Sequence, residues 1–248
     1  MNVVVLADSQ GLPRAKGWGN IPFEATYPYL LGQLLRDRLG DSAPFVIDRS
    51  SRGRTMKHVM RDWEEEVELK NARVIVLHVG GSDCAPRVFL PSEQEIIQKI
   101  PVKRVRQALL RLEKRHKRRI LSWMPQRVCV PLAKFEARVA DVVERVTRDA
   151  DRCLIFVNIM APTEHVSFHL PGLMENIASY NQVLARYCDS RRVHLVQLDR
   201  LVDDRGGAEK WTVDGVHLNG AGHLLLAREL EACVMRFVAS RFARKEGP

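Results

Sequence analysis

The chain has 248 residues, of which 46% are hydrophobic and 28% are charged, a composition that excludes a disordered or fibrous protein and suits one domain with a buried core. No apolar run approaches the roughly 18–20 residues that cross a bilayer, and Met1 leads directly into an apolar run without the charged start of a signal peptide. The formal net charge of +9 is local, because ten Lys or Arg residues and a single acid lie between Lys99 and Arg119.

Five short apolar runs alternate with helix-like sequence along the chain. They occupy residues 3–6, 45–47, 74–79, 154–159 and 193–198, and such nearly continuous runs are typical of parallel strands buried on both faces. Helices are expected at 29–39, between Pro28 and Gly40, and then around 135–146, 177–187 and after Gly220. The alternation predicts an α/β fold, a three-layer α/β/α sandwich around a parallel five-stranded sheet of flavodoxin-like type, in one domain over residues 1–248.

Polar residues and glycines follow the predicted strands, where parallel sheets bind ligands. Asp8 and Ser9 come after the first run, and Gly53 lies beyond the second. Beyond the last run, His217 follows Asp214 by three residues, so one turn can bring the carboxylate to the imidazole. Acyl transfer by a serine needs such a base and orienting acid, together with donors for the developing oxyanion.

Four blocks in this order resemble the SGNH or GDSL hydrolase superfamily. They read "ADSQG", "SSRGRT", "HVGGSDC" and "VDGVHLN", and they span almost the whole chain. The resemblance implies the same three-layer fold, with Ser9 as the nucleophile, His217 as its base and Asp214 as the acid that orients the base. It also implies that the backbone N–H groups of Ser9 and Gly53 donate to the oxyanion, while Asp8 has a local hydrogen-bonding role.

The third block departs from the family pattern, because Ser82 occupies the place of the asparagine whose amide is the third oxyanion donor. Loss of one such donor typically costs roughly 10²–10³ in turnover. The backbone amides of Gly81 and Ser82 are the first candidates to replace it, and Asn158 at the end of the fourth run is another. A smaller departure is Ala7 in place of the first glycine.

Candidate substrate-binding residues lie in the same loops. Arg52, Arg54 and Arg87 would favour a carboxylate or phosphate on the substrate; the alternative is ordinary surface ion pairing. Asn158 is a further candidate. His165 and His169 have the spacing of metal ligands on a helix, but nearby prolines predict a loop and no third ligand is evident, so no metal is expected.

The cysteines do not point to a cofactor or a disulfide framework. Their number is odd and no C-x-x-C pair occurs, so we expect reduced thiols, a cytoplasmic location and no cofactor. Cys84 lies near the third block, and we interpret it as structural, because the only evident base is matched to Ser9.

The basic segment predicts an amphipathic helix within a helical insertion around residues 92–125. A solvated outer face is the simplest interpretation, and an anionic substrate or membrane surface is the functional alternative. Nucleic acid ranks last, because no aromatic residues are interleaved with the basic ones. The insertion also lies where it could form a lid over the site.

The leading hypothesis is a serine esterase or O-acyltransferase that forms an acyl-enzyme on Ser9. Its substrate would be a small molecule or glycan ester, with a polar or anionic carbohydrate or small metabolite as the alcohol. The competing hypothesis is a binding or accessory protein for an anionic ligand, with the same fold and little or no turnover, for which Ser82 is the supporting residue. The sequence gives no indication of the oligomeric state.

Overall fold

The computed structural model describes residues 1–124, 126–188 and 192–245. Its strands are β1 (Asn2–Ala7), β2 (Phe45–Asp48), β3 (Ala72–His78), β4 (Cys153–Val157) and β5 (Val193–Val196). They form one parallel sheet in the order β2-β1-β3-β4-β5. This is the flavodoxin-like order, and it confirms the predicted α/β fold with a parallel five-stranded sheet.

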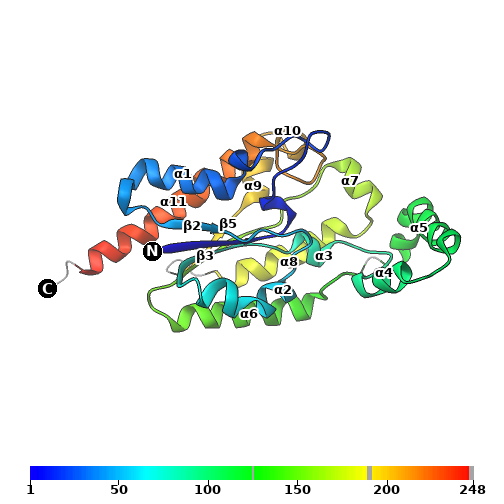
Figure 1. Cartoon of the computed structure of the whole chain (residues 1–248), viewed down its shortest axis with the longest axis horizontal. Helices are drawn as coiled ribbons and strands as arrows, with labels where there is room; N and C mark the ends of the chain where they lie inside the picture. Colours follow the sequence, from blue (N-terminus) through cyan, green and yellow to red (C-terminus); the bar gives the residue numbers. More distant parts are fainter. Residues whose placement is uncertain (125, 189–191, 246–248) are drawn as a thin grey trace.

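Helices cover both faces of the sheet (Figure 1). One face carries α1 (Tyr27–Leu39), α9 (Leu198–Asp203) and α11 (Gly220–Lys245), and the other carries α2 (Met56–Arg61), α6 (Leu132–Arg148) and α8 (Leu173–Arg186). Each face of the sheet has its own apolar core, and alternate residues of β1 point into the two cores. Val3 and Val5 pack against α1 and α11, whereas Val4 and Leu6 pack on the face covered by α2, α6 and α8. Because both faces of this interior strand are covered, residues 3–7 of β1 are all apolar and buried.

The remaining elements are shorter or lie outside these layers. They are α3 (Gly81–Cys84), α4 (Pro91–Gln98), α5 (Lys103–Trp123), α7 (Glu164–His169) and α10 (Ala208–Trp211), the 3₁₀ helices η1 (Ser9–Gly11), η2 (Phe23–Ala25) and η3 (Gly40–Ser42), and the π-helical turn η4 (Glu64–Glu68). Helices α4 and α5 occupy the region of the predicted basic insertion, of which residue 125 lies outside the described residues. Within the described residues, no helix combines the length and apolar character needed to cross a bilayer.

Helix α7 corrects the expectation of a loop at His165 and His169. Pro162 precedes the helix, and Pro171 follows its end. Proline breaks a helix only from within it, so these two residues bound a short helix rather than prevent one.

Backbone hydrogen bonds hold the loops after β1, β2 and β3 together at the carboxyl edge of the sheet. The N–H of Asp8 donates to the carbonyl of His78 (3.1 Å), and the N–H of Ser51 donates to the carbonyl of Ala7 (3.0 Å). The three loops that carry the predicted site residues therefore leave the sheet side by side.

Candidate active site

Ser9 is the second residue beyond the end of β1 and begins the short helix η1. The carboxylate of Asp8 accepts a hydrogen bond from the N–H of Gln10 (3.0 Å) and so caps this turn. Gly11 is required because a Cβ at that position would overlap the side chain of Ser50 in the loop after β2. The sequence "ADSQG" thus ends a strand abruptly and leaves the Ser9 hydroxyl in the cavities described below.

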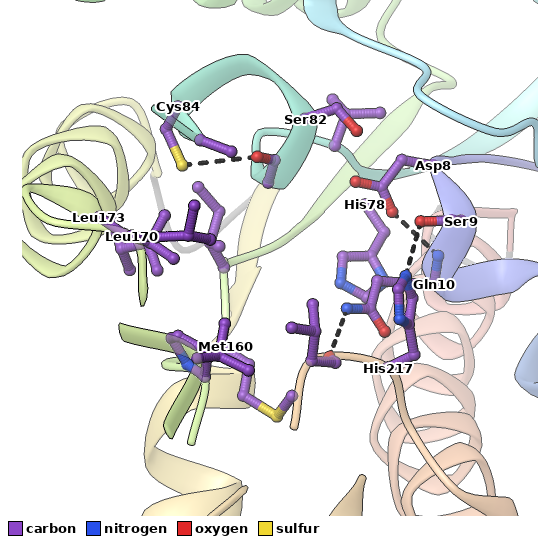
Figure 2. Close-up of a pocket in the computed structure, with 18 of the residues that line it drawn as sticks. Asp8, Ser9, Gln10, His78, Ser82, Cys84, Met160, Leu170, Leu173 and His217 are labelled. Carbon is purple, nitrogen blue, oxygen red and sulfur yellow. Dashed lines mark hydrogen bonds between the residues drawn. The ribbon is translucent and has the colours of Figure 1, made fainter. Parts of the chain in front are cut away.

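The hydroxyl of Ser9 faces His217, and His217 faces Asp214. Ser9 Oγ lies 2.9 Å from His217 Nε2 (Figure 2). His217 Nδ1 lies 2.8 Å from Asp214 Oδ2, and the backbone N–H of His217 donates to Asp214 Oδ1 (2.8 Å). Since the Asp214 carboxylate accepts a hydrogen bond from Nδ1–H, the proton of the neutral ring stays on Nδ1 and Nε2 is free to accept the proton of Ser9. The three residues expected to form the catalytic relay are brought together in the order that acyl transfer requires.

The electrostatics of this relay keep the imidazole neutral. Burial lowers the pKa of His217 and the positive charge of Arg14 lowers it further, while the hydrogen bond to Asp214 acts in the opposite direction. Burial alone would raise the pKa of Asp214, but the hydrogen bonds from His217 outweigh it and hold that pKa below its usual value. A neutral imidazole beside an ionised carboxylate is the state needed for a general base.

Two site residues carry no motif and were missing from the sequence prediction. Arg14 Nη1 lies 3.7 Å from Asp214 Oδ2, on a segment held by a β-bridge between Arg14 and Ile21. Gln10 spans to the loop of the base, since its Nε2 donates to the carbonyl of Val216 (2.8 Å). Their closeness to Ser9 in the sequence was the only signal that either residue belongs to the site. Their partners, Asp214 and Val216, lie about 200 positions further along the chain.

Of the predicted oxyanion donors, Gly53, Gly81 and Ser82 line cavities that also include Ser9. Gly53 lines a cavity together with Ser9, and its positive φ of 65° suits glycine. Gly81 and Ser82 open helix α3 and line a second cavity with Ser9. Burial raises the pKa of the neighbouring Asp8 to about 6, against hydrogen bonds from Gln10 and from both the N–H and the hydroxyl of Ser82. Both the N–H and the hydroxyl of Ser82 are thus engaged with Asp8, which leaves the N–H of Gly81 as the remaining candidate for the third donor.

Two cavities meet at the Ser9–His217 pair. We term the first the basic cavity; it measures about 500 Å³, and its lining includes Arg14, Trp18, Arg52 and Arg87. The second, the apolar cavity, measures about 200 Å³ and extends between α3, α7 and α8. Trp18 is 71% exposed and was not predicted as a site residue.

The structure corrects two of the predicted substrate-binding residues. Arg54 is buried and turned away, with Nε donating to Ser51 Oγ (3.1 Å) and Nη2 at 3.9 Å from a carboxylate oxygen of Glu66. Asn158 is also buried, and its Oδ1 accepts the N–H of Asp199 (3.1 Å) at the start of α9. Each side chain stabilises the scaffold and lines neither cavity.

The other nucleophile candidate, Cys84, also lines the apolar cavity but is not activated. Cys84 is fully buried, and burial raises the pKa of its thiol far above the usual value, so it is not a thiolate. The rings of His165 and His169 lie 4.8 Å apart on α7. Among residues 1–124, 126–188 and 192–245, no group of three ligating side chains could hold a metal ion.

Comparison with known proteins gives one family and several solved structures. The model of the GDSL-like lipase/acylhydrolase family matches residues 15–225, a range that includes Asp214 and His217 and begins just after Ser9. An acetylxylan esterase from Geobacillus stearothermophilus superposes with a TM-score of 0.60 at 16% identity, covering 92% of this chain and 90% of that one. An α/β hydrolase from the metagenome of Lake Arreo superposes with a TM-score of 0.62 at 16% identity, covering 93% of each chain. No curated protein matches the chain by sequence.

Proposed function

Since the chain belongs to the GDSL-like lipase/acylhydrolase family and is a serine esterase by that membership, we propose that it removes or transfers the acyl group of an ester through an acyl-enzyme on Ser9. The alcohol would be polar or anionic, a carbohydrate or a small metabolite. The observation that carries this proposal is the Ser9–His217–Asp214 relay at the junction of the two cavities.

The proposed reaction follows from the geometry of the relay. Ser9 Oγ attacks the ester carbonyl while its proton passes to His217 Nε2, and Asp214 stabilises the imidazolium. The backbone N–H groups around Ser9 and Gly53 stabilise the oxyanion of the tetrahedral intermediate. His217 then returns the proton to the departing alkoxide, which leaves an acyl group on Ser9. Water or a second hydroxyl attacks this ester, again with His217 as the base, and releases Ser9.

The basic cavity supports a polar or anionic alcohol. Arg52 and Arg87 present guanidinium groups that pair well with carboxylate or phosphate. Trp18 adds an exposed aromatic face, and the superposed enzyme from Geobacillus stearothermophilus is described as an acetylxylan esterase. These observations favour a sugar that carries an ester and a negative charge.

Two acetylated sugars, one neutral and one with a carboxylate, test whether the alcohol part of the substrate is anionic. We expect kcat/KM to be about tenfold higher for the acidic sugar, and Arg52→Ala to remove most of this difference. Arg36→Ala is the control, because Arg36 is an exposed arginine on α1 that lines neither cavity. Equal rates for the two sugars would contradict an anionic alcohol. Binding of the acidic sugar without turnover of any ester would favour the alternative, an inactive binding protein.

Helix α5 supports a second element of the proposal, contact with an anionic membrane surface. The helix extends away from the sheet at one end of the molecule (Figure 1), and Leu121 is its one buried residue. Leu112 (55% exposed) and Trp123 (75% exposed) lie on its solvent-facing apolar stripe, beside a dense set of Lys and Arg residues. Exposed apolar residues flanked by positive charge are the pattern of helices that lie on anionic lipid.

Vesicle sedimentation tests this contact. We expect binding to be at least about tenfold stronger with phosphatidylglycerol in the vesicles than with phosphatidylcholine alone, and to fall when Leu112 and Trp123 are both replaced by serine. Leu69→Ser is the control, because Leu69 is equally exposed but lies far from α5. Absence of vesicle binding, or tighter salt-sensitive binding to duplex DNA, would contradict a membrane surface as the partner.

A further inference from the structure

The apolar cavity begins at the reacting atoms and continues into the protein. Ser9 and His217 form part of its lining at one end, and six apolar side chains form the other: Ile159, Met160, Val166, Leu170, Leu173 and Ile177. Figure 2 shows Met160, Leu170 and Leu173 across the cavity from Ser9 and His217. An acyl carbon attached to Ser9 therefore has an apolar space in front of it.

The size of this space exceeds what an acetyl group fills. A cavity of about 150 Å³ holds a benzene molecule, so one of about 200 Å³ holds roughly six to eight carbon atoms. Asp8 and Arg87 also belong to the lining of this cavity. Burial lowers the pKa of His78, another lining residue, to about 3 and leaves its ring neutral. An extended alkyl chain suits the end formed by the six apolar side chains better than a sugar.

The part of the cavity wall that lies on α7 is hydrogen-bonded to the loop that carries Asp214 and His217. The N–H of Thr163, just before α7, donates to the carbonyl of Gly215 (2.9 Å), which lies between Asp214 and His217. Gly215 has a φ of 83°, and a Cβ there would overlap Thr163 and contact Val166. Helix α7, which supplies Val166 to the wall and is followed directly by Leu170, is thus held at a set distance from the base.

From these observations we infer that the apolar cavity is the binding site of the acyl chain, and that the preferred acyl group is an unbranched chain of about four to eight carbons rather than acetyl. This inference rests on the proposed esterase function. Val166 on α7 and Leu170, the residue after its end, set the chain length, because they are only partly buried and line the cavity. The alcohol occupies the basic cavity, which shares Ser9 and His217 with the apolar cavity.

A chain-length series tests the inference directly. With p-nitrophenyl esters from acetate to dodecanoate, we expect kcat/KM to rise roughly threefold to fourfold per added methylene up to hexanoate or octanoate, and then to fall. Val166→Phe is expected to lower kcat/KM for hexanoate at least tenfold and to change that for acetate less than about threefold. Leu170→Phe provides a second filling variant, and Met174→Phe is the control, because Met174 is exposed on α8 and lies outside the cavity.

A binding measurement separates this inference from the proposed function. Octanoate, the product of such an ester, is expected to raise the melting temperature where acetate does not, and Val166→Phe to reduce this rise. Turnover that is highest for acetate, with no stabilisation by octanoate, would overturn the acyl-chain site and leave the esterase intact. Stabilisation by octanoate without hydrolysis of any ester would retain the chain site and overturn the esterase.

Discussion

Replacing Ser9 with alanine is expected to lower kcat/KM on the order of 10⁴-fold or more for every ester that the protein hydrolyses. In the proposed mechanism Ser9 supplies the attacking oxygen, and its Oγ lies 2.9 Å from His217 Nε2. Without it, only the oxyanion donors and the bound geometry remain, which leave a small residual rate over water. Initial rates with a p-nitrophenyl ester at several concentrations measure the loss.

The fold is expected to survive this substitution, because Ser9 lies at the end of β1 and its hydroxyl contributes no core packing. Circular dichroism and the melting temperature of the variant check this point. Ser240→Ala is the matched control, since Ser240 lies on α11 and its hydroxyl bonds only to its own helix. More than a tenth of the native rate in the Ser9 variant would assign the nucleophile to another residue.

Asp214→Asn is expected to lower kcat by about 10³–10⁴-fold, with the geometry almost unchanged. The carboxylate holds the proton on Nδ1 of His217 and stabilises the imidazolium, and a neutral amide does neither. The hydrogen bond that His217 donates to Asp214 also raises the pKa of His217. Its loss lowers that pKa further, so the acid limb of the residual pH–rate profile should move to lower pH.

Arg14→Gln supplies the opposite shift and serves as the control for Asp214→Asn. The charge of Arg14 lowers the pKa of His217, so its removal raises that pKa and moves the acid limb to higher pH, while most of the rate at alkaline pH is retained. Acid limbs that move in the same direction in both variants would contradict the assignment of the limb to His217.

The sequence predicted the sheet well because strands buried on both faces leave a simple pattern. The runs at 3–6 and 74–79 coincide with β1 and β3 to within two residues at each end. The later runs were drawn too long, since β4 ends at Val157 and β5 at Val196. Apolar residues continue past the ends of both strands, because Ile159 lines the apolar cavity and Leu198 begins α9. The sequence alone does not reveal whether an apolar residue belongs to a strand, a cavity wall or the next helix.

The relay was predictable because its residues stand in short blocks at strand ends, whereas the walls of the two cavities were not. Arg14 and Trp18 reach the site through a loop whose path depends on the bridge between Arg14 and Ile21. Arg54 had the same local signal as Arg52, but it turns inward to Glu66, whose position is set by the π-helical turn after α2. Such choices depend on tertiary neighbours rather than on spacing along the chain.

The most direct test of the central claim is the site of covalent labelling by a fluorophosphonate, located by peptide mapping of the intact protein. The account predicts one adduct, on Ser9, formed at a rate that rises as His217 loses its proton and abolished by His217→Ala. Labelling of another residue, or no labelling at any pH at which the protein is folded, would contradict a serine nucleophile at Ser9.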